Sequence, residues 1–369
     1  MAGTFDVVVV GAGIIGCAVA YELARRGARV TMADDRPVGH GATRASGGML
    51  VPYIEARPDD PLLRLGSASL ALYDEFVARV AADAGMAVEY RRTGTLQVAL
   101  DEGDIETLRA ALDAQRTAGV ASEWLDAEAA RRLEPHLAPD VLAGLFVPAH
   151  GYVAAEALAS ALVAAASRFG ARIEVGRVVR VERRDGRLVA RTAGDGRLEA
   201  DRIVLAAGSW TALVEVDGER PLPIRPVRGQ LLHLAWPGEP MARIVWGPRC
   251  YLVPRLDGSL LVGATVEETG FDERATVAGV RDLIEAACEV VPEVWRAGFG
   301  GARAGLRPAT PDHLPVIGPS RAVAGLVYAT GHFRNGVLLA PLTAALVAGL
   351  LLDDREDELL AALSPERFS

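Results

Sequence analysis

The pattern of apolar and polar residues is most regular at the start of the chain. Residues 7–10 are four consecutive valines, as is typical of a strand buried on both faces of a parallel sheet. A glycine-rich loop follows at once, and a helix then runs to Gly27, a residue type favoured at helix C-termini. Residues 29–33 form a second apolar strand that ends just before Asp34. The pattern therefore predicts a βαβ unit over residues 1–35.

Later segments of similar apolar character are expected to extend this unit. They comprise a helix at 154–169, strands at 172–174, 178–182, 188–191 and 203–205, and a buried helix at 337–352. Two apolar strands end in small residues and glycine, at Ala206-Ala207-Gly208 and at Ala329-Thr330-Gly331. Such endings allow the chain to turn beside a ligand.

The segments in between have a different pattern. Residues 93–100 alternate like a strand, residues 104–118 are expected to form a helix, and antiparallel strands are expected at 230–234, 250–254 and 260–262. We therefore expect an α/β fold in which a Rossmann-type dinucleotide-binding domain accompanies a second domain built on an antiparallel sheet. The first, discontinuous domain is expected over residues 1–85, 149–217 and 304–369, and the second over residues 86–148 and 218–303.

Composition excludes several classes of protein. With 369 residues, 50% of them hydrophobic, and a mean hydropathy of +0.21, the chain can bury a sizeable core, which argues against a disordered protein. The net charge of −9, the pI near 5.3 and the absence of a basic run argue against a nucleic-acid partner. Homo-oligomerisation is compatible with this composition.

The cysteines and histidines indicate neither disulfides nor a metal site. Cys17, Cys250 and Cys288 are far apart and odd in number, and the six histidines lack metal-ligand spacing. A reducing cytoplasm fits this cysteine usage best. Residues 7–20 are interrupted by glycines, and the apolar run at 337–352 is shorter than the about 18 residues that span a bilayer, so we expect no stable membrane insertion.

The glycine-rich loop carries the first chemical signal. Gly11, Gly13 and Gly16 form a G-x-G-x-x-G motif directly after the first strand. In such a motif the first glycine permits the tight turn, the second lets the backbone approach a pyrophosphate, and the third packs the helix on the sheet. Asp34 lies 18 residues after Gly16, near the position of a ribose-binding acid. The motif in this setting predicts a dinucleotide.

The loop at residues 43–49 bears on which dinucleotide is bound. Its residues are mostly small and closely follow the βαβ acid, which suits a close approach to the diphosphate and flavin of FAD. A nicotinamide site rarely needs such a loop. The alternative is a flexible surface loop rich in small residues.

Two arginines near the C-terminus indicate an anionic substrate. Arg307 and Arg334 lie among glycines and prolines, in the segments GLRP and GHFRNG. There a guanidinium can meet a carboxylate with two hydrogen bonds. The alternative is that both are solvated, as most of the chain's 39 arginines must be.

Together these segments resemble the glycine oxidases of the FAD-dependent D-amino-acid oxidase family. The resemblance spans essentially the whole chain and rests on the glycine motif with Asp34, on residues 46–50, 207–210, 226–229, 250–254 and 262–265, and on GLRP and GHFRNG. It implies a non-covalently bound FAD and a substrate domain with an antiparallel sheet above the flavin. It also implies that Tyr251 and Arg307 hold the substrate carboxylate and that Arg334 contacts the substrate or the flavin.

A larger set of residues is expected to bind the cofactor, from the motif and from the resemblance. This set is Gly11, Gly13, Ile14, Ile15, Gly16, Asp34, Asp35, Ala42, Thr43, Arg44, Gly47, Gly48, Met49, Val178, Ala207, Gly208, Trp210, His332, Arg334, Asn335, Gly336, Val337 and Leu338. Gly336 begins the last helix, whose amide groups could stabilise a reduced, anionic flavin. Simple packing of an apolar helix is the alternative.

The residue types suit the oxidation of an amino acid. Transfer of the Cα hydride to a flavin requires mainly that the carboxylate and Cα are held in place, so an arginine and a tyrosine suffice without a strong base. We expect glycine, sarcosine or a small D-amino acid to be oxidised by O2 through FAD, giving an imine or 2-oxo acid and hydrogen peroxide. The resemblance further implies a role in thiamine thiazole synthesis or in amino-acid catabolism.

Two alternative functions stay open. One is an FAD-dependent dehydrogenase of D-amino acids or secondary amines that passes electrons to a quinone or a carrier. The other is a flavin-bound sensor or assembly subunit without catalytic activity. Two departures from the family pattern also bear on the site: Arg44 to Gly47 replace a serine and an alanine pair, and Val266 replaces a methionine. The diphosphate contacts and the pocket size are therefore the features that the resemblance constrains least.

Overall fold

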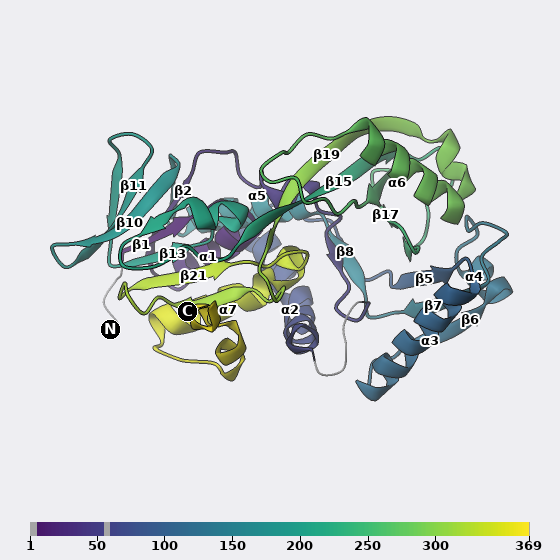
Figure 1. Cartoon of the computed structure of the whole chain (residues 1–369), viewed down its shortest axis with the longest axis horizontal. Helices are drawn as coiled ribbons and strands as arrows, with labels where there is room; N and C mark the ends of the chain where they lie inside the picture. The colour runs from purple at the N-terminus through teal and green to yellow at the C-terminus, as the bar shows by residue number, and fades with distance from the viewer. Residues whose placement is uncertain (1–5, 55–59, 369) are drawn as a thin grey trace.

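The computed structural model describes residues 6–54 and 60–368, which are organised around two large sheets in different halves of an elongated molecule (Figure 1). The first sheet has six strands in the order β20-β21-β13-β1-β2-β9. All neighbouring pairs in it are parallel except β20 with β21. Its strands are β1 (Asp6–Val10), β2 (Arg29–Asp34), β9 (Arg172–Val175), β13 (Arg202–Leu205), β20 (Val316–Pro319) and β21 (Leu326–Thr330).

Four helices pack together beside this sheet. α1 contacts α5 and α7, and α2 contacts the same two helices. Their bounds are α1 (Ile14–Arg25), α2 (Pro61–Ala84), α5 (Ala155–Arg168) and α7 (Gly336–Leu352). The βαβ unit β1-α1-β2 is confirmed, and Gly27 follows the end of α1 with a φ of +92°. α7 is buried along nearly its whole length, which confirms a core helix. Among the described residues, no helix is both long and apolar enough to cross a membrane.

Two small sheets flank the six-stranded sheet and the cavity described below. One has the order β12-β11-β10-β14 and the other the order β3-β8-β4. The turn between β10 and β11 is formed by Asp185 and Gly186, both with positive φ, as is typical of a tight β-hairpin. The strands are β3 (Met49–Leu50), β4 (Tyr90–Arg91), β8 (Gly151–Val153), β10 (Val178–Arg184), β11 (Arg187–Thr192), β12 (Arg197–Ala200) and β14 (Glu215–Val216).

The second large sheet has eight strands in the order β19-β15-β18-β17-β16-β5-β7-β6, and only β16 with β5 is a parallel pair. α6 packs on β15 and β18, while α3 and α4 pack on β7 at the other end. The strands are β5 (Thr95–Ala99), β6 (Glu123–Asp126), β7 (Ala143–Val147), β15 (Arg225–Ala235), β16 (Ile244–Trp246), β17 (Tyr251–Pro254), β18 (Ser259–Gly263) and β19 (Gly298–Ala309), and the helices are α3 (Glu102–Thr117), α4 (Ala127–Leu133) and α6 (Val277–Val290).

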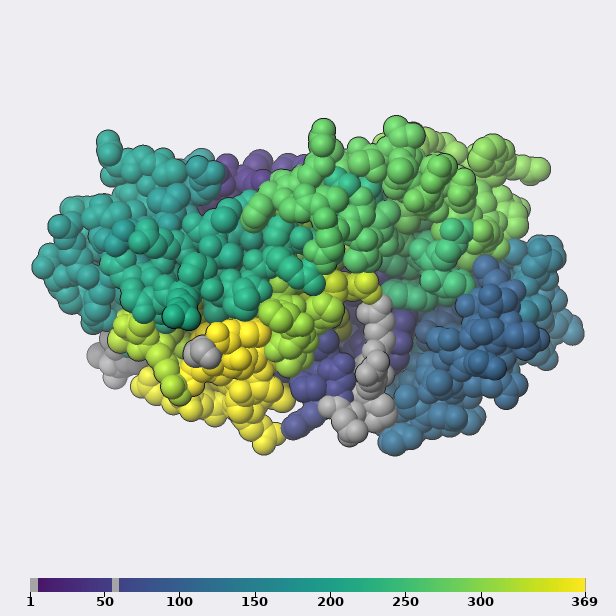
Figure 2. Space-filling view, in the orientation of Figure 1, coloured from purple at the N-terminus to yellow at the C-terminus, as the bar shows by residue number. Residues whose placement is uncertain are grey.

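The eight-stranded sheet confirms the expected antiparallel architecture and adds four strands that the pattern did not indicate, β6, β7, β16 and β19. β19 is rich in glycine, so it lacks the alternation of a typical strand, yet it pairs with β15 over its whole length. The domain boundary expected after residue 303 falls inside β19, and the division into two domains stays a prediction. In the space-filling view, the blue residues of β5, β7 and α3 lie at the end of the molecule opposite the teal strands β10 and β11 (Figure 2).

Candidate functional site

A cavity of about 850 Å³ is lined by both large sheets. Its walls come from the carboxyl ends of β1, β2 and β13, from the loop around Thr43, from Tyr251 in β17, from Arg307 in β19 and from the start of α7. Ligands of parallel α/β sheets bind at the carboxyl ends of the strands, so this is where a dinucleotide is expected.

The glycine loop is shaped by close backbone contacts. A Cβ atom on Gly16 would lie 1.9 Å from the backbone oxygen of Gly11, which explains why α1 packs tightly on the loop only with glycine there. Gly11 itself has a φ of +108°, in the region that only glycine adopts easily. The N-terminus of α1 then faces the cavity with Gly13 and Ile14, as a pyrophosphate site requires.

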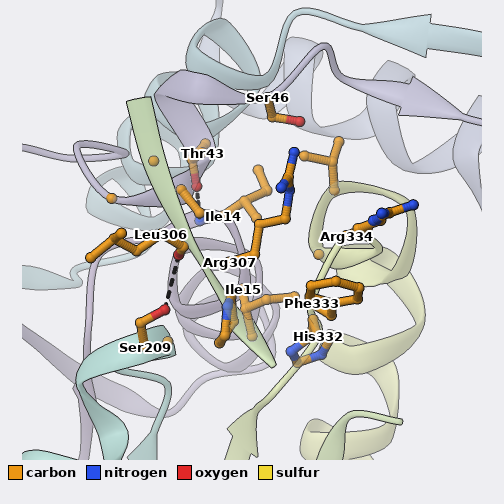
Figure 3. Close-up of a pocket in the computed structure, with 18 of the residues that line it drawn as sticks. Ile14, Ile15, Thr43, Ser46, Ser209, Leu306, Arg307, His332, Phe333 and Arg334 are labelled. Atoms are coloured by element: carbon orange, nitrogen blue, oxygen red, sulfur yellow. Dashed lines mark hydrogen bonds between the residues drawn. The ribbon is translucent and has the colours of Figure 1, made fainter. Parts of the chain in front are cut away.

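Thr43 and Asp34 hold this loop in place. The backbone NH of Ile14 donates to Thr43 Oγ1 at 3.0 Å, a bond visible in Figure 3. The backbone NH of Ala12 donates to Asp34 Oδ2 at 2.7 Å, and Asp34 also lines the cavity. A carboxylate oxygen has more than one lone pair, so Asp34 can accept the bond from Ala12 and still accept ribose hydroxyls.

The loop of small residues is packed between strands. A Cβ atom on Gly48 would lie 1.9 Å from the backbone oxygen of Val153, and one on Gly305 would lie 2.7 Å from the Cβ of Ala45. Side chains at these positions would force the loop away from β8 and β19. The loop is therefore a fitted part of the cavity wall rather than an exposed surface loop, and its backbone is open to a ligand.

The three residues expected to act on the substrate share one end of the cavity. Tyr251, Arg307 and Arg334 all line it. Figure 3 shows Arg307 extending from its strand toward Ser46, with Arg334 and Phe333 beside it, while Leu306 turns to the other side and accepts a hydrogen bond from Ser209. Arg307 Nη1 donates to the backbone oxygen of Thr265 at 2.9 Å.

The charges at this end favour an anionic ligand. Burial raises the pKa of Tyr251, and the positive charges of Arg307 and Arg334 oppose that rise. Tyr251 is therefore a neutral phenol at physiological pH and can donate a hydrogen bond. His332 is also neutral, because burial lowers its pKa to about 3, and its Nε2 lies 3.0 Å from Thr343 Oγ1. The cationic charge among these groups thus resides on the two arginines.

Two glycines shape the positions of these side chains, although the sequence pattern indicates no role for either of them. A Cβ atom on Gly229 would lie 2.2 Å from Arg307 Nη2, and one on Gly263 would lie 2.4 Å from Tyr251 Oη. Both glycines belong to segments that carry the family resemblance. The glycines were therefore visible in the sequence, but their role becomes clear only from the side chain that lies where each Cβ atom would be.

Most of the residues expected at the site are brought together. All the expected catalytic and cofactor-binding residues line the cavity except Gly16 and Arg44. Gly16 acts through packing, as described above. Arg44 lies in the short 3-10 turn η1 (Ala42–Ala45), directly after Thr43. Successive residues of such a turn point about 120° apart, so Thr43 faces α1 and the cavity while Arg44 faces elsewhere.

One part of the wall was not expected from the sequence. The guanidinium of Arg36 lies 4.1 Å from the centre of the Trp210 ring and forms a bidentate pair with Glu273, 2.7 Å at its closest. Both Arg36 and Trp210 line the cavity near Asp34. Glu273 is 237 positions away in sequence, so no local pattern indicates this pair.

The arrangement fits an FAD. The glycine loop and the N-terminus of α1 are suited to the diphosphate, Asp34 to the ribose, and the loop at 45–49 with the start of α7 to the flavin. Within residues 6–54 and 60–368, no three histidine, cysteine, aspartate or glutamate side chains gather as they would around a metal ion.

Comparison with known proteins supports this interpretation. The family model described as FAD dependent oxidoreductase matches residues 6–350. Glycine oxidase of Geobacillus kaustophilus (strain HTA426) is 34% identical to this chain over 354 residues, which cover 95% of this chain and 94% of that protein. The crystal structure of glycine oxidase from Geobacillus kaustophilus superimposes with a TM-score of 0.92 at 33% identity and covers 98% of both chains.

Two further relatives extend the comparison. The crystal structure of iminodiacetate oxidase from Chelativorans sp. BNC1 has a TM-score of 0.88 at 29% identity, over 97% of this chain and 98% of that one. The Bifunctional protein ThiO/ThiG of Synechocystis sp. (strain ATCC 27184 / PCC 6803 / Kazusa) is 36% identical over 377 residues, covering 100% of this chain but 55% of its own length. This chain thus spans about half the length of that relative. On the match of the family model to nearly its whole length, the chain belongs to the FAD-dependent oxidoreductase family.

Proposed function

We propose that this protein is an FAD-dependent oxidase of small amino acids, with glycine as its first candidate substrate. One observation carries the proposal: Tyr251, Arg307 and Arg334 line the same cavity as the residues suited to hold FAD. A carboxylate-binding group beside a flavin site is what the oxidation of an α-amino acid requires. The relatives named glycine oxidase and iminodiacetate oxidase support a substrate that contains a glycine unit.

In the proposed mechanism the protein's main task is to hold the substrate. Arg307 binds the carboxylate through two charge-assisted hydrogen bonds, and the neutral phenol of Tyr251 donates a third. Arg334 adds positive charge at the same end of the cavity. FAD held by the glycine loop, Asp34 and the start of α7 would supply the acceptor for the hydride of Cα, and its reoxidation by O2 would give hydrogen peroxide. For glycine the overall products are glyoxylate, ammonia and hydrogen peroxide, with water consumed when the imine hydrolyses.

The cavity offers little for a base-catalysed alternative. Among the described residues that line it, the acidic side chains are Asp34, Asp35 and Asp60. The first two lie at the end of β2, beside the glycine loop, and Asp60 caps the N-terminus of α2 by accepting from the backbone NH of Leu62 at 2.8 Å. Positioning of a substrate with a neutral amine therefore accounts for the reaction better than proton removal by a carboxylate.

Further parts of the proposal concern the protein as a whole. We infer that a substrate domain over residues 86–148 and 218–303 stands against a discontinuous FAD domain, and that FAD is bound without a covalent link. The three cysteines are free thiols, which suits a reducing cytoplasm. A role in thiamine thiazole synthesis would be supported if deletion of the gene made growth depend on an added thiazole precursor.

The decisive experiment is anaerobic mixing of the purified, FAD-loaded protein with glycine, sarcosine, iminodiacetate and small D-amino acids. Loss of flavin absorbance identifies a substrate. Admission of air then separates the functions: rapid return of the colour with hydrogen peroxide formation supports an oxidase. Slow return in air, but fast return with a quinone, would favour the dehydrogenase. Absence of bleaching by every amine in the panel would contradict the proposal.

A further inference from the structure

The side chain of Arg307 is held by a segment that also forms part of the cavity wall. Its Nη1 donates to the backbone oxygen of Thr265 at 2.9 Å, and more weakly to that of Arg228 at 3.4 Å. Ala264 and Val266 line the cavity, whereas Thr265 between them does not. Ala264 and Val266 therefore form part of the cavity wall, while Thr265 between them orients Arg307.

Thr265 is fixed from the side that faces away from the cavity. Its Oγ1 accepts a hydrogen bond from the backbone NH of Gln230 at 2.9 Å and donates to Glu267 Oε1 at 2.5 Å. The amide Nε2 of Gln230, a completely buried residue, donates to the same carboxylate oxygen at 2.7 Å. The hydroxyl of Thr265 thus serves as donor and acceptor at once, which leaves its carbonyl little freedom to move.

Arg228 completes the network behind Thr265. Its Nη2 lies 2.5 Å from Glu267 Oε2, and its backbone NH and oxygen pair with those of Glu267 at 2.9 and 3.0 Å. The side chain of Arg228 is only 5% exposed, and Asp272 gives it a second carboxylate partner at 2.9 Å. Burial raises the pKa of Glu267, but its hydrogen bonds from Arg228, Thr265 and Gln230 outweigh burial and hold that pKa below its usual value. The carboxylate is therefore charged, and it needs each of these partners.

We propose that the network of Thr265, Glu267 and Arg228 is a positioning device for Arg307, setting the orientation in which its guanidinium meets the substrate carboxylate. The inference rests on the proposed function, because it takes Arg307 to be a carboxylate-binding group. Thr265 and Glu267 themselves stay outside the cavity and act through Arg307. Such a network matters because a displacement of about 1 Å in a bound group can lower the rate about 100-fold.

The test compares two substitutions at Thr265. Thr265→Val removes the hydroxyl and keeps the shape, so the carbonyl that holds Arg307 loses its support. We expect the Kd of acetate, followed through the absorbance of the FAD-loaded protein, and the KM of the amino acid to rise about tenfold, with a smaller change in kcat. Thr265→Ser keeps the hydroxyl and should stay within about twofold of the wild type.

A double-mutant cycle separates positioning from a general structural role. In the Arg307→Ala background, Thr265→Val should cause no further loss of kcat/KM, because the group on which it acts is gone. A further tenfold loss in that background would overturn the inference. Thr95→Val is the matched control: Thr95 is a fully buried threonine in the same sheet, outside the cavity lining, and its hydroxyl has no hydrogen-bond partner within the described chain. That variant should bind acetate as the wild type does.

Two further comparisons keep the test decisive. If Thr265→Val does not retain FAD, Glu267→Gln takes its place, and the same rise in the Kd of acetate with the same insensitivity to Arg307→Ala is expected. An unchanged Kd of acetate in the folded variant would overturn the network's role alone. A wild-type protein that binds acetate but is reduced by no amino acid would instead contradict the proposed function, and the acetate titrations would still test the network.

Discussion

Replacing Gly229 by alanine should disable the substrate site while leaving the fold and the FAD site intact. The new Cβ atom would lie 2.2 Å from Arg307 Nη2, 2.3 Å from Cζ and 2.5 Å from Nη1. Non-bonded contacts of a Cβ atom are seldom closer than about 3.4 Å, so the guanidinium must withdraw by about 1.2 Å. The atoms in the way are the far end of a flexible side chain, and the side chain can move without disturbing the strand pair β15 and β19.

The magnitude follows from that displacement. A shift of this size breaks the 2.9 Å bond from Arg307 to Thr265 and misdirects the two bonds to the substrate carboxylate. Misplacement by about 1 Å costs about 100-fold in rate, so we expect kcat/KM to fall about 100-fold, which corresponds to about 2.7 kcal/mol.

The assay is steady-state oxygen consumption with the best amino acid of the panel, together with FAD content and thermal unfolding. Gly238→Ala is the matched control, because a Cβ atom there meets nothing within 4 Å and the residue has no positive φ. If Gly229→Ala kept kcat/KM within about threefold of the wild type, Arg307 would not be the group that holds the substrate.

Three other predictions concern Arg307 and Asp34 in the site and His150, a fully buried residue outside the cavity lining. Arg307→Ala should lower kcat/KM by a factor that corresponds to about 3 to 5 kcal/mol of lost transition-state stabilisation, with FAD still bound. Arg307→Lys should restore only part of kcat/KM, because an ammonium group lacks the planar fork of a guanidinium. Near-normal turnover by the alanine variant would refute this prediction. Asp34→Ala should weaken FAD binding by about 1 to 3 kcal/mol in a titration of the apoprotein, through lost bonds to the ribose and to Ala12. Burial lowers the pKa of His150 to about 3, against 6.5 when exposed. Between these two pH values His150 is protonated in the unfolded chain but neutral in the native protein. Below about pH 6 this site alone should lower the free energy of unfolding by about 1.4 kcal/mol per pH unit, and denaturant titrations at pH 6 and 5 should show a shallower loss in His150→Phe.

The sequence predicts those parts of the molecule whose structure depends on residues close together in the chain. The glycine motif is a run of six residues, and its turn, its helix and its acid at Asp34 all appear where the pattern places them. Tyr251 was assigned by resemblance alone, whereas Arg307 was indicated both by its setting among glycine and proline and by the resemblance. The pair of Arg36 with Glu273 could not be predicted, because its two members meet only through the folded chain. β19 was missed for a related reason. Its glycines, such as Gly305 beside the loop at Ala45, make room for neighbouring segments, and they interrupt the alternation of apolar and polar residues that is typical of a strand.

Glycine is the residue type at which sequence and structure differ most in what they reveal. In the sequence, Gly229 and Gly263 lie directly outside the expected strands 230–234 and 260–262 and look like strand ends. In the structure, the lack of a Cβ atom at each glycine leaves space for a functional side chain, Arg307 beside Gly229 and Tyr251 beside Gly263. Gly229 and Gly305 are also direct partners across β15 and β19, so both lie on the same face of this strand pair. The space beside Gly229 is occupied by Arg307, and the space beside Gly305 by the loop at Ala45. An alanine at 229 should therefore impair substrate binding, whereas an alanine at 305 should press on the loop suited to the flavin and impair FAD binding. Loss of FAD from both variants, or from neither, would show that this strand pair does not separate the two tasks.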